Sequence, residues 1–253
     1  MSPIEVALLT CTLMLLGAAA GAQLRRVLPG HHLNDHAKDI VRLGTGLIAT
    51  MSALVLGLLI NSASNAYEAQ RNEVRQIATN LILIDELLER YGPEAQPLRK
   101  LLRGSVEPLV TALWGEAGRP PSKDMPHNPD GHAARAFIAM HELAPQTDLQ
   151  RSIQSQVIQT TIATQRSRLM LFERSHAAIP VPLLVTLISW LVMIFVSFSL
   201  FLPLNPTSMV ALLVIALSAS SGIFLILEMG QPFHGLLQIS SRALSTALAP
   251  LAS

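Results

Sequence analysis

Residues 175–227, SHAAIPVPLLVTLISWLVMIFVSFSLFLPLNPTSMVALLVIALSASSGIFLIL, contain no Asp, Glu, Lys or Arg. A membrane-spanning helix needs about 20 apolar residues, so this stretch is too long for one helix and has the length of two. Residues 203–206, Pro-Leu-Asn-Pro, interrupt it with residues that end helices and form turns. The sequence therefore predicts a helical hairpin in the membrane, with crossings at residues 182–202 and 207–228.

Two earlier stretches have the same character. Residues 4–23 carry only Glu5, and residues 43–62, which follow Arg42, carry no charge. At 1.5 Å per residue, either stretch spans a hydrocarbon core of about 30 Å. A cleaved signal peptide is disfavoured because no basic residue precedes Ile4. We therefore expect an all-α integral membrane protein with four transmembrane helices in two pairs.

The composition agrees with this division. Of the 253 residues 50% are hydrophobic and 14% charged, which excludes a soluble secreted enzyme or a disordered chain. The net charge is +1 and no long run of Lys or Arg occurs, so nucleic acid is not an expected partner. Cys11 is the single cysteine, so disulfides and cysteine-based zinc sites are not expected. The predicted parts are residues 1–62 (first helix pair), 63–176 (water-facing), 177–230 (hairpin) and 231–253 (C-terminal tail).

The water-facing part is predicted to be helical and partly a coiled coil. No Gly or Pro lies between Gly57 and Gly92, so the second crossing can continue to Tyr91 as one helix. Its apolar spacing of three and four residues is typical of a coiled coil, over Tyr67, Gln70, Val74, Ile77, Leu81, Ile84, Leu88 and Tyr91. An antiparallel partner with the same spacing is predicted over Ile158, Ile162, Gln165, Leu169 and Phe172. Between them we expect two short helices, 97–103 and 106–114, with Ser105 as N-cap of the second, and a loop over 119–132.

Few residues suggest chemistry. An enzyme or a proton-coupled transporter within the membrane needs ionisable residues at membrane depth, and Glu228, at a helix end, is expected to be only an interfacial charge. His32 and His36 could share a helical face and bind a metal, but the same segment suits a helix start capped by Asn34. We favour the cap and predict no metal, no cofactor and no catalytic residue.

Small residues mark two helices. Gly17 and Gly21 in the first crossing are typical of close helix packing, as are the small residues of 218–222 in the fourth. In the second crossing a mildly polar stripe runs along one face, either for close packing or for bordering a water-filled path. Its members, the predicted pore-lining residues, are Gly46, Thr50, Ala53, Gly57, Asn61 and Ser64. Arg42 and Arg71 lie near its two ends, and a path with no acidic residue would favour anions.

Several of these residues resemble a known family. Asn34-Asp35, the stretch around Tyr67, Arg71 and Val74, Trp114-Gly115-Glu116, and residues 231–235 (Gln-Pro-Phe-His-Gly) are similar to the bestrophin-like bacterial membrane proteins. The resemblance covers nearly the whole chain. It implies a pentameric, passive channel for small anions such as chloride, with the second helix lining the pore and the termini and residues 63–176 in the cytoplasm. The excess of Arg over Lys is typical of GC-rich bacteria and agrees with a bacterial inner membrane. The alternative function is a membrane-anchored helical scaffold or signalling protein without transport activity.

Overall fold

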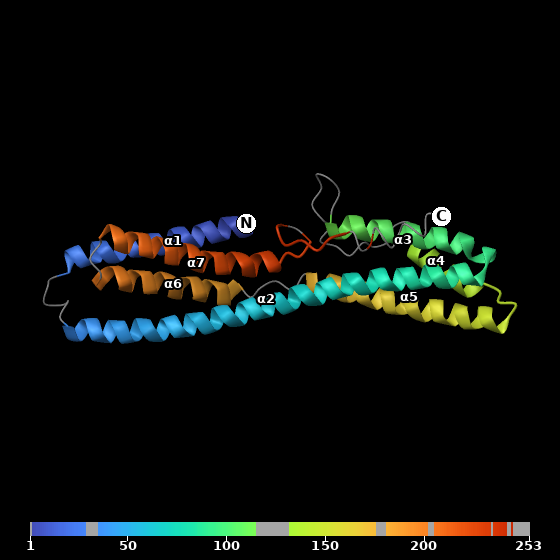
Figure 1. Ribbon diagram of the computed structural model, residues 1–253, viewed down its shortest axis with the longest axis horizontal. Helices are drawn as coiled ribbons and strands as arrows, with labels where there is room; N and C mark the ends of the chain where they lie inside the picture. The colour runs from blue at the N-terminus through green and yellow to red at the C-terminus, as the bar shows by residue number, and fades with distance from the viewer. Residues whose placement is uncertain are drawn as a thin grey trace. The chain divides into compact units, whose positions relative to one another are not determined.

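The computed structural model describes residues 2–28, 35–114, 132–175, 181–201, 205–233, 235–241 and 244. Within these residues every regular element is a helix (Figure 1). The elements are α1 (Pro3–Val27), α2 (Asp35–Tyr91), η2 (Pro93–Ala95), α3 (Gln96–Trp114), α4 (His132–Glu142), α5 (Asp148–Ser175), α6 (Val181–Phe201) and α7 (Pro206–Met229). Four of them, α1, α2, α6 and α7, are long and apolar enough to cross a membrane. The prediction of an all-helical protein with four candidate crossings is confirmed.

The chain divides into two compact units. The first unit comprises residues 1–67 and 178–230, and the second comprises residues 68–177 and 231–253. Helix α2 is unbroken, as the absence of Gly and Pro predicted, and contributes residues to both units. The first unit therefore holds the apolar crossings, and the second holds the more polar helices.

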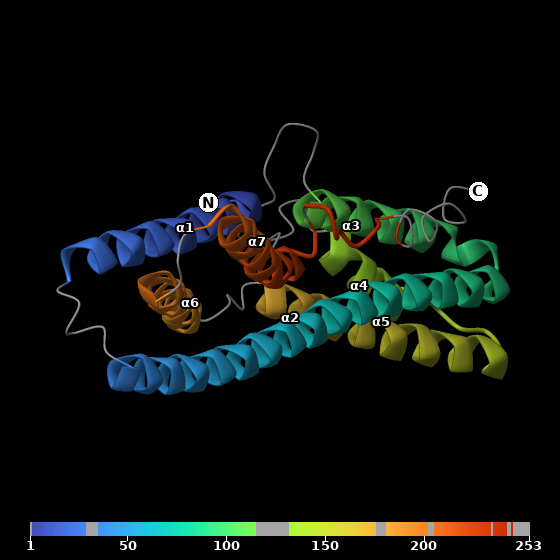
Figure 2. The same ribbon diagram turned by 60° about the vertical axis from the view of Figure 1, so that its left-hand side comes forward.

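In the first unit α1 packs against α6 and α7, its neighbours in space though not in sequence (Figures 1 and 2). A Cβ atom on Gly17 would lie 3.0 Å from Val192 Cγ1, and one on Gly21 would overlap the carbonyl oxygen of Val196. Both glycines are buried, so α1 and α6 touch backbone to side chain and backbone to backbone here. The predicted close packing at this pair of glycines is confirmed.

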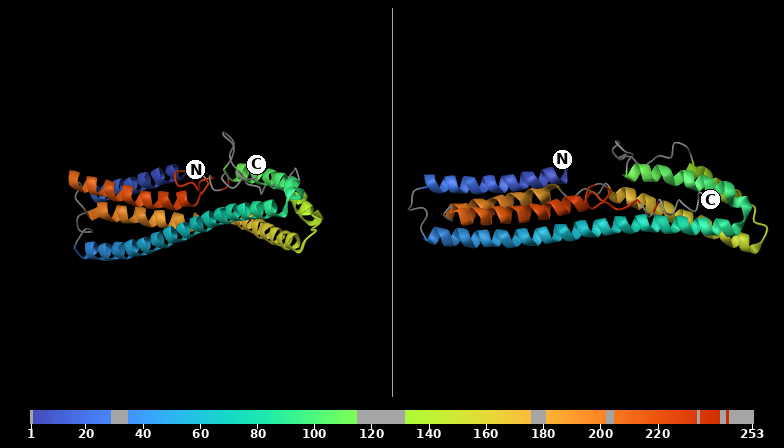
Figure 3. Two further views of the ribbon diagram at one scale, coloured as in Figure 1. Left: turned by 45° about the vertical axis from the view of Figure 1, so that its right-hand side comes forward. Right: turned by 45° about the horizontal axis from the view of Figure 1, so that its top comes forward.

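Helix α2 packs on α6 and α7 from another side. Leu59 and Ala63 form a buried cluster with Leu187 of α6 and with Ile223 and Ile226 of α7. Figure 3 shows α6 and α7 lying between α1 and the first part of α2. The sequence order of the crossings therefore does not determine which helices touch.

The ends of the membrane helices show why they begin where they do. At the start of α1, Ser2 Oγ accepts from the Glu5 backbone N–H at 3.2 Å, and the Glu5 carboxylate accepts from the Ser2 N–H at 2.8 Å. Such a capping box satisfies two otherwise unpaired helix donors. At α7, Asn205 precedes the helix and its N–H donates to Ser208 Oγ at 2.9 Å. The predicted turn lies between α6 and α7, and its residues 203 and 204 are outside the described residues.

Glu228 lies at the end of α7, as predicted, one residue before Met229. Its side chain is only 3% exposed, which the sequence did not indicate. Within 218–222, Ser220 is buried while Ser218 and Ser221 are exposed, so only part of that small-residue segment lies in a helix contact. Because α7 is apolar on all sides, its sequence pattern did not distinguish the inward face from the outward one.

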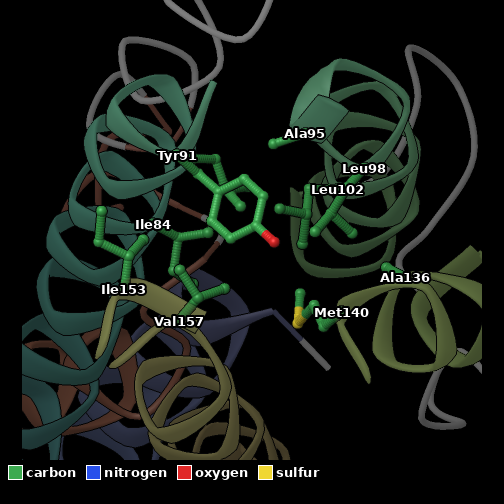
Figure 4. Packing of buried hydrophobic residues seen from close by; sticks show 10 residues of the cluster. Ile84, Tyr91, Ala95, Leu98, Leu102, Ala136, Met140, Ile153 and Val157 are labelled. Carbon is green, nitrogen blue, oxygen red and sulfur yellow. The ribbon is translucent and has the colours of Figure 1, made fainter. Parts of the chain in front are cut away.

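The core of the second unit lies between α2, α3, α4 and α5 (Figure 4). Its buried residues are Ile84, Leu88, Tyr91, Ala95, Leu98, Leu102, Ala136, Met140, Ile153 and Val157. Gln150 Nε2, near the start of α5, donates to the carbonyl of Tyr91 at the end of α2, so these two helices are antiparallel. The predicted α2 stripe from Gln70 to Tyr91 is buried, whereas a coiled-coil geometry for the pair stays a prediction.

The partner stripe predicted on α5 is confirmed only in part: Ile158 packs against the core, Gln165 lines a cavity beside it and Phe172 is buried, but the other two residues are not. Ile162 and Leu169 are each 54% exposed, whereas the residues one position earlier, Thr161 and Arg168, face the core or a cavity within it. The apolar spacing correctly indicated a helix with an inward face, but that face also includes Thr161 and Thr164 in place of Ile162 and Leu169. The buried positions are partly filled by threonine, which a hydrophobicity pattern does not single out.

The segment between α2 and α5 also differs from expectation. Residues 96–114 form one helix, α3, because Ser105 does not cap a new helix; its hydroxyl donates back to the Leu102 carbonyl at 2.7 Å. Helix α4 was not predicted at all, and it begins at His132, where the predicted loop was to end. Residues 115–131, most of that loop, lie outside the described residues.

Candidate pore-lining face of α2

Within the first unit α2 presents three faces along its length. One face is buried against α6 and α7 and includes Thr45, Ser52, Leu59 and Ala63. A second, the leucine face, is exposed and consists of Leu43, Leu47, Leu54 and Leu58. The third is the predicted pore stripe, here called the small-residue face, which consists of Gly46, Thr50, Ala53, Gly57, Asn61 and Ser64. All its members are exposed except Ser64, which is half-buried.

The small-residue face is open rather than packed within one chain. A Cβ atom on Gly46 or Gly57 would meet no atom within 4 Å. This contrasts with Gly21 of α1, where a Cβ would overlap the neighbouring helix. Thr50 satisfies its hydroxyl by donating to the Leu47 carbonyl at 2.8 Å. At Gly46 and Gly57, therefore, no described residue of the same subunit packs against this face, and Gly46 also borders a cavity with α6 and α7.

The two exposed faces suit different surroundings. Large leucine side chains match lipid chains, because exposed Leu loses nothing in a hydrocarbon solvent. Glycine, threonine and asparagine gain little from lipid and instead suit another protein surface or water. The sequence prediction singled out these six residues correctly as one helix face, and the structure leaves that face uncovered.

The basic residues predicted at the ends of this face lie in different surroundings. Arg42 is exposed and lines an open cavity of about 770 Å³ in the first unit, together with Lys38, Thr45 and Ser208. Arg71 belongs to the second unit and its Nη1 lies 3.3 Å from Glu68 Oε1, with both side chains about half exposed. Arg71 is thus part of a surface ion pair rather than an unpaired cation.

The candidate metal residues cannot be placed fully. His32 and Asn34 lie outside the described residues, and His36 lies in α2 with a side chain that is not described. Among the residues that the structure describes, no group of three or more His, Cys, Asp or Glu side chains could hold a metal ion.

A comparison with protein families decides the relationship of this chain. The family model described as the bestrophin-like domain matches residues 11–244, which includes most of α1, the other three candidate crossings and the helices between them. The chain belongs to the bestrophin-like family. The suspected resemblance is thereby confirmed. No curated protein and no solved structure matches the sequence.

The tail of this bestrophin-like chain carries part of the motif that suggested the family. Phe233 is buried and meets the ring of Trp114 edge to face, with ring centroids 5.3 Å apart and planes at 81°. Trp114 Nε1 donates to the Ile239 carbonyl at 2.7 Å, and the Ile239 N–H donates to the Pro232 carbonyl. The residues after α7 therefore fold onto the end of α3. Sequence reasoning noted Trp114 and Phe233 separately but had no signal that they touch.

Two further features of the bestrophin-like second unit were missed. Asp85 and Arg99 form a buried, bidentate ion pair, with Nε to Oδ1 at 2.6 Å and Nη2 to Oδ2 at 3.0 Å. Hydrogen bonding of the Arg99 guanidinium to the Asp85 carboxylate is the main cause that raises the pKa of Arg99, and burial opposes it. Arg168 of α5, which the sequence pattern did not single out, lines a small cavity in the second unit. In the sequence, these charged residues cannot be distinguished from exposed surface charges, because their burial depends on helices that are distant in the chain.

Proposed function

We propose that this protein is an oligomeric membrane channel that passively conducts small anions, with the small-residue face of α2 along the conducting path. Its membership of the bestrophin-like family supports a channel. The single observation that carries the assignment to α2 is the exposure of Gly46, Thr50, Gly57 and Asn61 on one open face. The proposal includes no catalytic activity.

The charges near this face favour anions. Residues 43–67 contain no Asp or Glu, so no acidic ring can attract cations along this part of α2. At one end of this uncharged segment Lys38, Asp39 and Arg42 line one cavity, so two basic side chains stand there against one acidic side chain. At the other end Glu68 is paired with Arg71. A positive group at an entrance raises the local anion concentration. Chloride is the simplest ion to test.

One exposed helix face cannot enclose a path, so the proposal requires several copies of the chain. Two residues of the stripe predicted on α5, Ile162 and Leu169, support such an assembly because each is more than half exposed in the single chain. Exposed isoleucine and leucine at seven-residue spacing on a polar helix are typical of a subunit contact. Family resemblance suggests five subunits, with the second unit in the cytoplasm of a bacterial cell.

Chloride efflux from liposomes containing the purified protein tests the proposal. The critical variant is Thr50→Phe, which places a bulky ring on the small-residue face. The matched control is Leu54→Phe, about one turn along α2 on the leucine face, where a ring would face lipid. We expect wild type and Leu54→Phe to release chloride faster than protein-free liposomes, and Thr50→Phe to lose most of that release.

The oligomeric state of each variant must be measured beside its flux, by mass determination in detergent. Equal loss of flux in both phenylalanine variants, with the assembly intact, would remove the small-residue face from the path. No chloride release by the wild-type protein under any voltage or pH tested would favour the scaffold function, in which the crossings only anchor the second unit.

A further inference from the structure

A small internal cavity lies within the second unit, between α2, α3 and α5. It offers about 20 Å³ to the centre of a water-sized molecule. One water needs about 10–15 Å³ measured in this way, so the cavity has room for one small molecule or ion. Most of its wall is apolar, from Ile77, Leu81, Leu102 and their neighbours, and a charged group therefore stands out in it.

That charged group is Arg168 of α5. Its guanidinium carries five N–H donors and remains a cation at neutral pH. The structure gives it one long hydrogen bond, from Nη2 to the Ser105 carbonyl at 3.4 Å, and no ion pair with any described carboxylate. Burial lowers the pKa of Arg168 for this reason: water is removed and no negative charge replaces it. Arg99, in the same unit, has Asp85 as a bidentate partner.

The other polar groups in the wall determine what could sit beside Arg168. The hydroxyls of Thr161 and Thr164 already donate, to Met140 Sδ at 3.4 Å and to the Thr160 carbonyl at 2.7 Å. The side-chain amide of Gln165 makes no hydrogen bond to a described residue and can donate two. The wall thus offers unused donors from Arg168 and Gln165, and the described part of the wall has no acidic side chain.

We propose that this cavity binds a single chloride ion, held by the guanidinium of Arg168 with help from the amide of Gln165. A half-buried cation in apolar surroundings is costly unless an anion accompanies it, and the described side chains supply none here. The cavity volume of about 20 Å³ suits a monatomic anion better than sulfate, phosphate or an organic anion. Bound chloride would then stabilise the contact of α5 with α2 and α3, and the stability of the second unit would depend on the chloride concentration.

Thermal unfolding of the full-length protein in detergent tests this site independently of conduction. Chloride is titrated against gluconate at constant ionic strength, because gluconate is too large for the cavity. For the wild type we expect a saturable rise of about 5 °C in the unfolding midpoint as chloride binds. Sulfate at equal ionic strength should produce no such rise. The variant Arg168→Met should lose the chloride dependence, and in gluconate it should unfold no earlier than the wild type, since a buried charge has been removed.

The matched control is Arg166→Met on the same helix, where Arg166 is exposed and outside the cavity wall. It should keep the full chloride dependence. Should Arg168→Met not fold, crystals of the wild type grown in bromide provide the second test, through an anomalous difference peak beside the Arg168 guanidinium. A chloride response that survives in Arg168→Met, or the absence of any bromide peak in the cavity, would overturn the proposal. A flux defect alone would affect the proposed function and leave this site standing.

Discussion

The buried ion pair between Asp85 and Arg99 allows the most direct test of what holds the second unit together. The side chain of Asp85 is 4% exposed and that of Arg99 is 9% exposed, so water contributes little to either charge. The two hydrogen bonds join α2 to α3. The perturbation is Asp85→Ala, which leaves the guanidinium buried without its carboxylate.

The expected size of the effect follows from this burial. A surface pair contributes about 0–1 kcal/mol, whereas removing one partner of a buried pair costs about 3–5 kcal/mol. At about 2–4 °C per kcal/mol for a protein of this size, Asp85→Ala should lower the unfolding midpoint by on the order of 10 °C. The double variant Asp85→Leu/Arg99→Met, which removes both charges and keeps apolar volume, should recover most of the loss.

Circular dichroism of the full-length protein in detergent follows unfolding of all helices. Trp114 fluorescence, measured with Trp190 of α6 replaced by phenylalanine, reports on the second unit. Because Asp85 raises the pKa of Arg99, the pair stabilises the fold at every pH below the unfolded pKa of arginine. That stabilisation is lost only as the pH rises through the folded value, in strong alkali, so the effect of Asp85→Ala should not change between pH 6 and about pH 9. A midpoint shift below about 2 °C, or a double variant no more stable than the single one, would refute the claim that burial makes this pair strong.

Three further predictions use single substitutions. Gly21→Ala should destabilise the first unit by about 1–3 kcal/mol, because the added methyl group overlaps the α6 backbone. The control Gly46→Ala, on an open helix face, should be neutral or slightly stabilising. Reaction of the buried Cys11 with a thiol dye during heating measures the unfolding midpoint of each variant, and equal midpoints would contradict the packing. Tyr91→Phe should leave the unfolding midpoint unchanged or raised, since the Tyr91 hydroxyl is buried with no hydrogen-bond partner among the described residues, and a fall of several degrees would mean that it has one. Trp114→Phe keeps an aromatic ring but loses the bond to the Ile239 carbonyl, so limited proteolysis should cut the C-terminal tail faster than in wild type; an unchanged rate would show that ring packing alone holds the tail.

The crossings were predictable because the signal for them is local. Residues 175–227 lack any charged side chain, and burial in lipid is the physical reason for such a run. The uninterrupted α2 was predictable for a similar reason, since the absence of Gly and Pro is visible in the sequence. The small-residue face was also found correctly as a face, because helical periodicity fixes which residues share one side.

The sequence predictions that were wrong concern which helix face packs against which neighbouring helix. Ile162 and Leu169 are apolar at the right spacing, yet the fold turns them outward and places Thr161 and Thr164 inside. Threonine can be buried at little cost when its hydroxyl bonds to the helix backbone, as Thr164 does. The burial of Glu228 at the end of α7 was likewise not indicated by the sequence. A sequence pattern shows which residues share one face of a helix, but it does not show which other helix covers that face.

The packing of α1 has a consequence for biosynthesis. Its tightest contacts, at Gly17 and Gly21, are with α6, which the ribosome makes only after residues 68–177 have emerged. The second unit meets a similar delay, because Phe233 and Ile239 reach Trp114 only when the tail is complete. Each unit therefore completes its packing only with a segment that is synthesised late. A chain that stops before residue 181 would leave Gly17 and Gly21 of α1 in lipid without α6. A chain that stops after α7 would leave Trp114 uncovered.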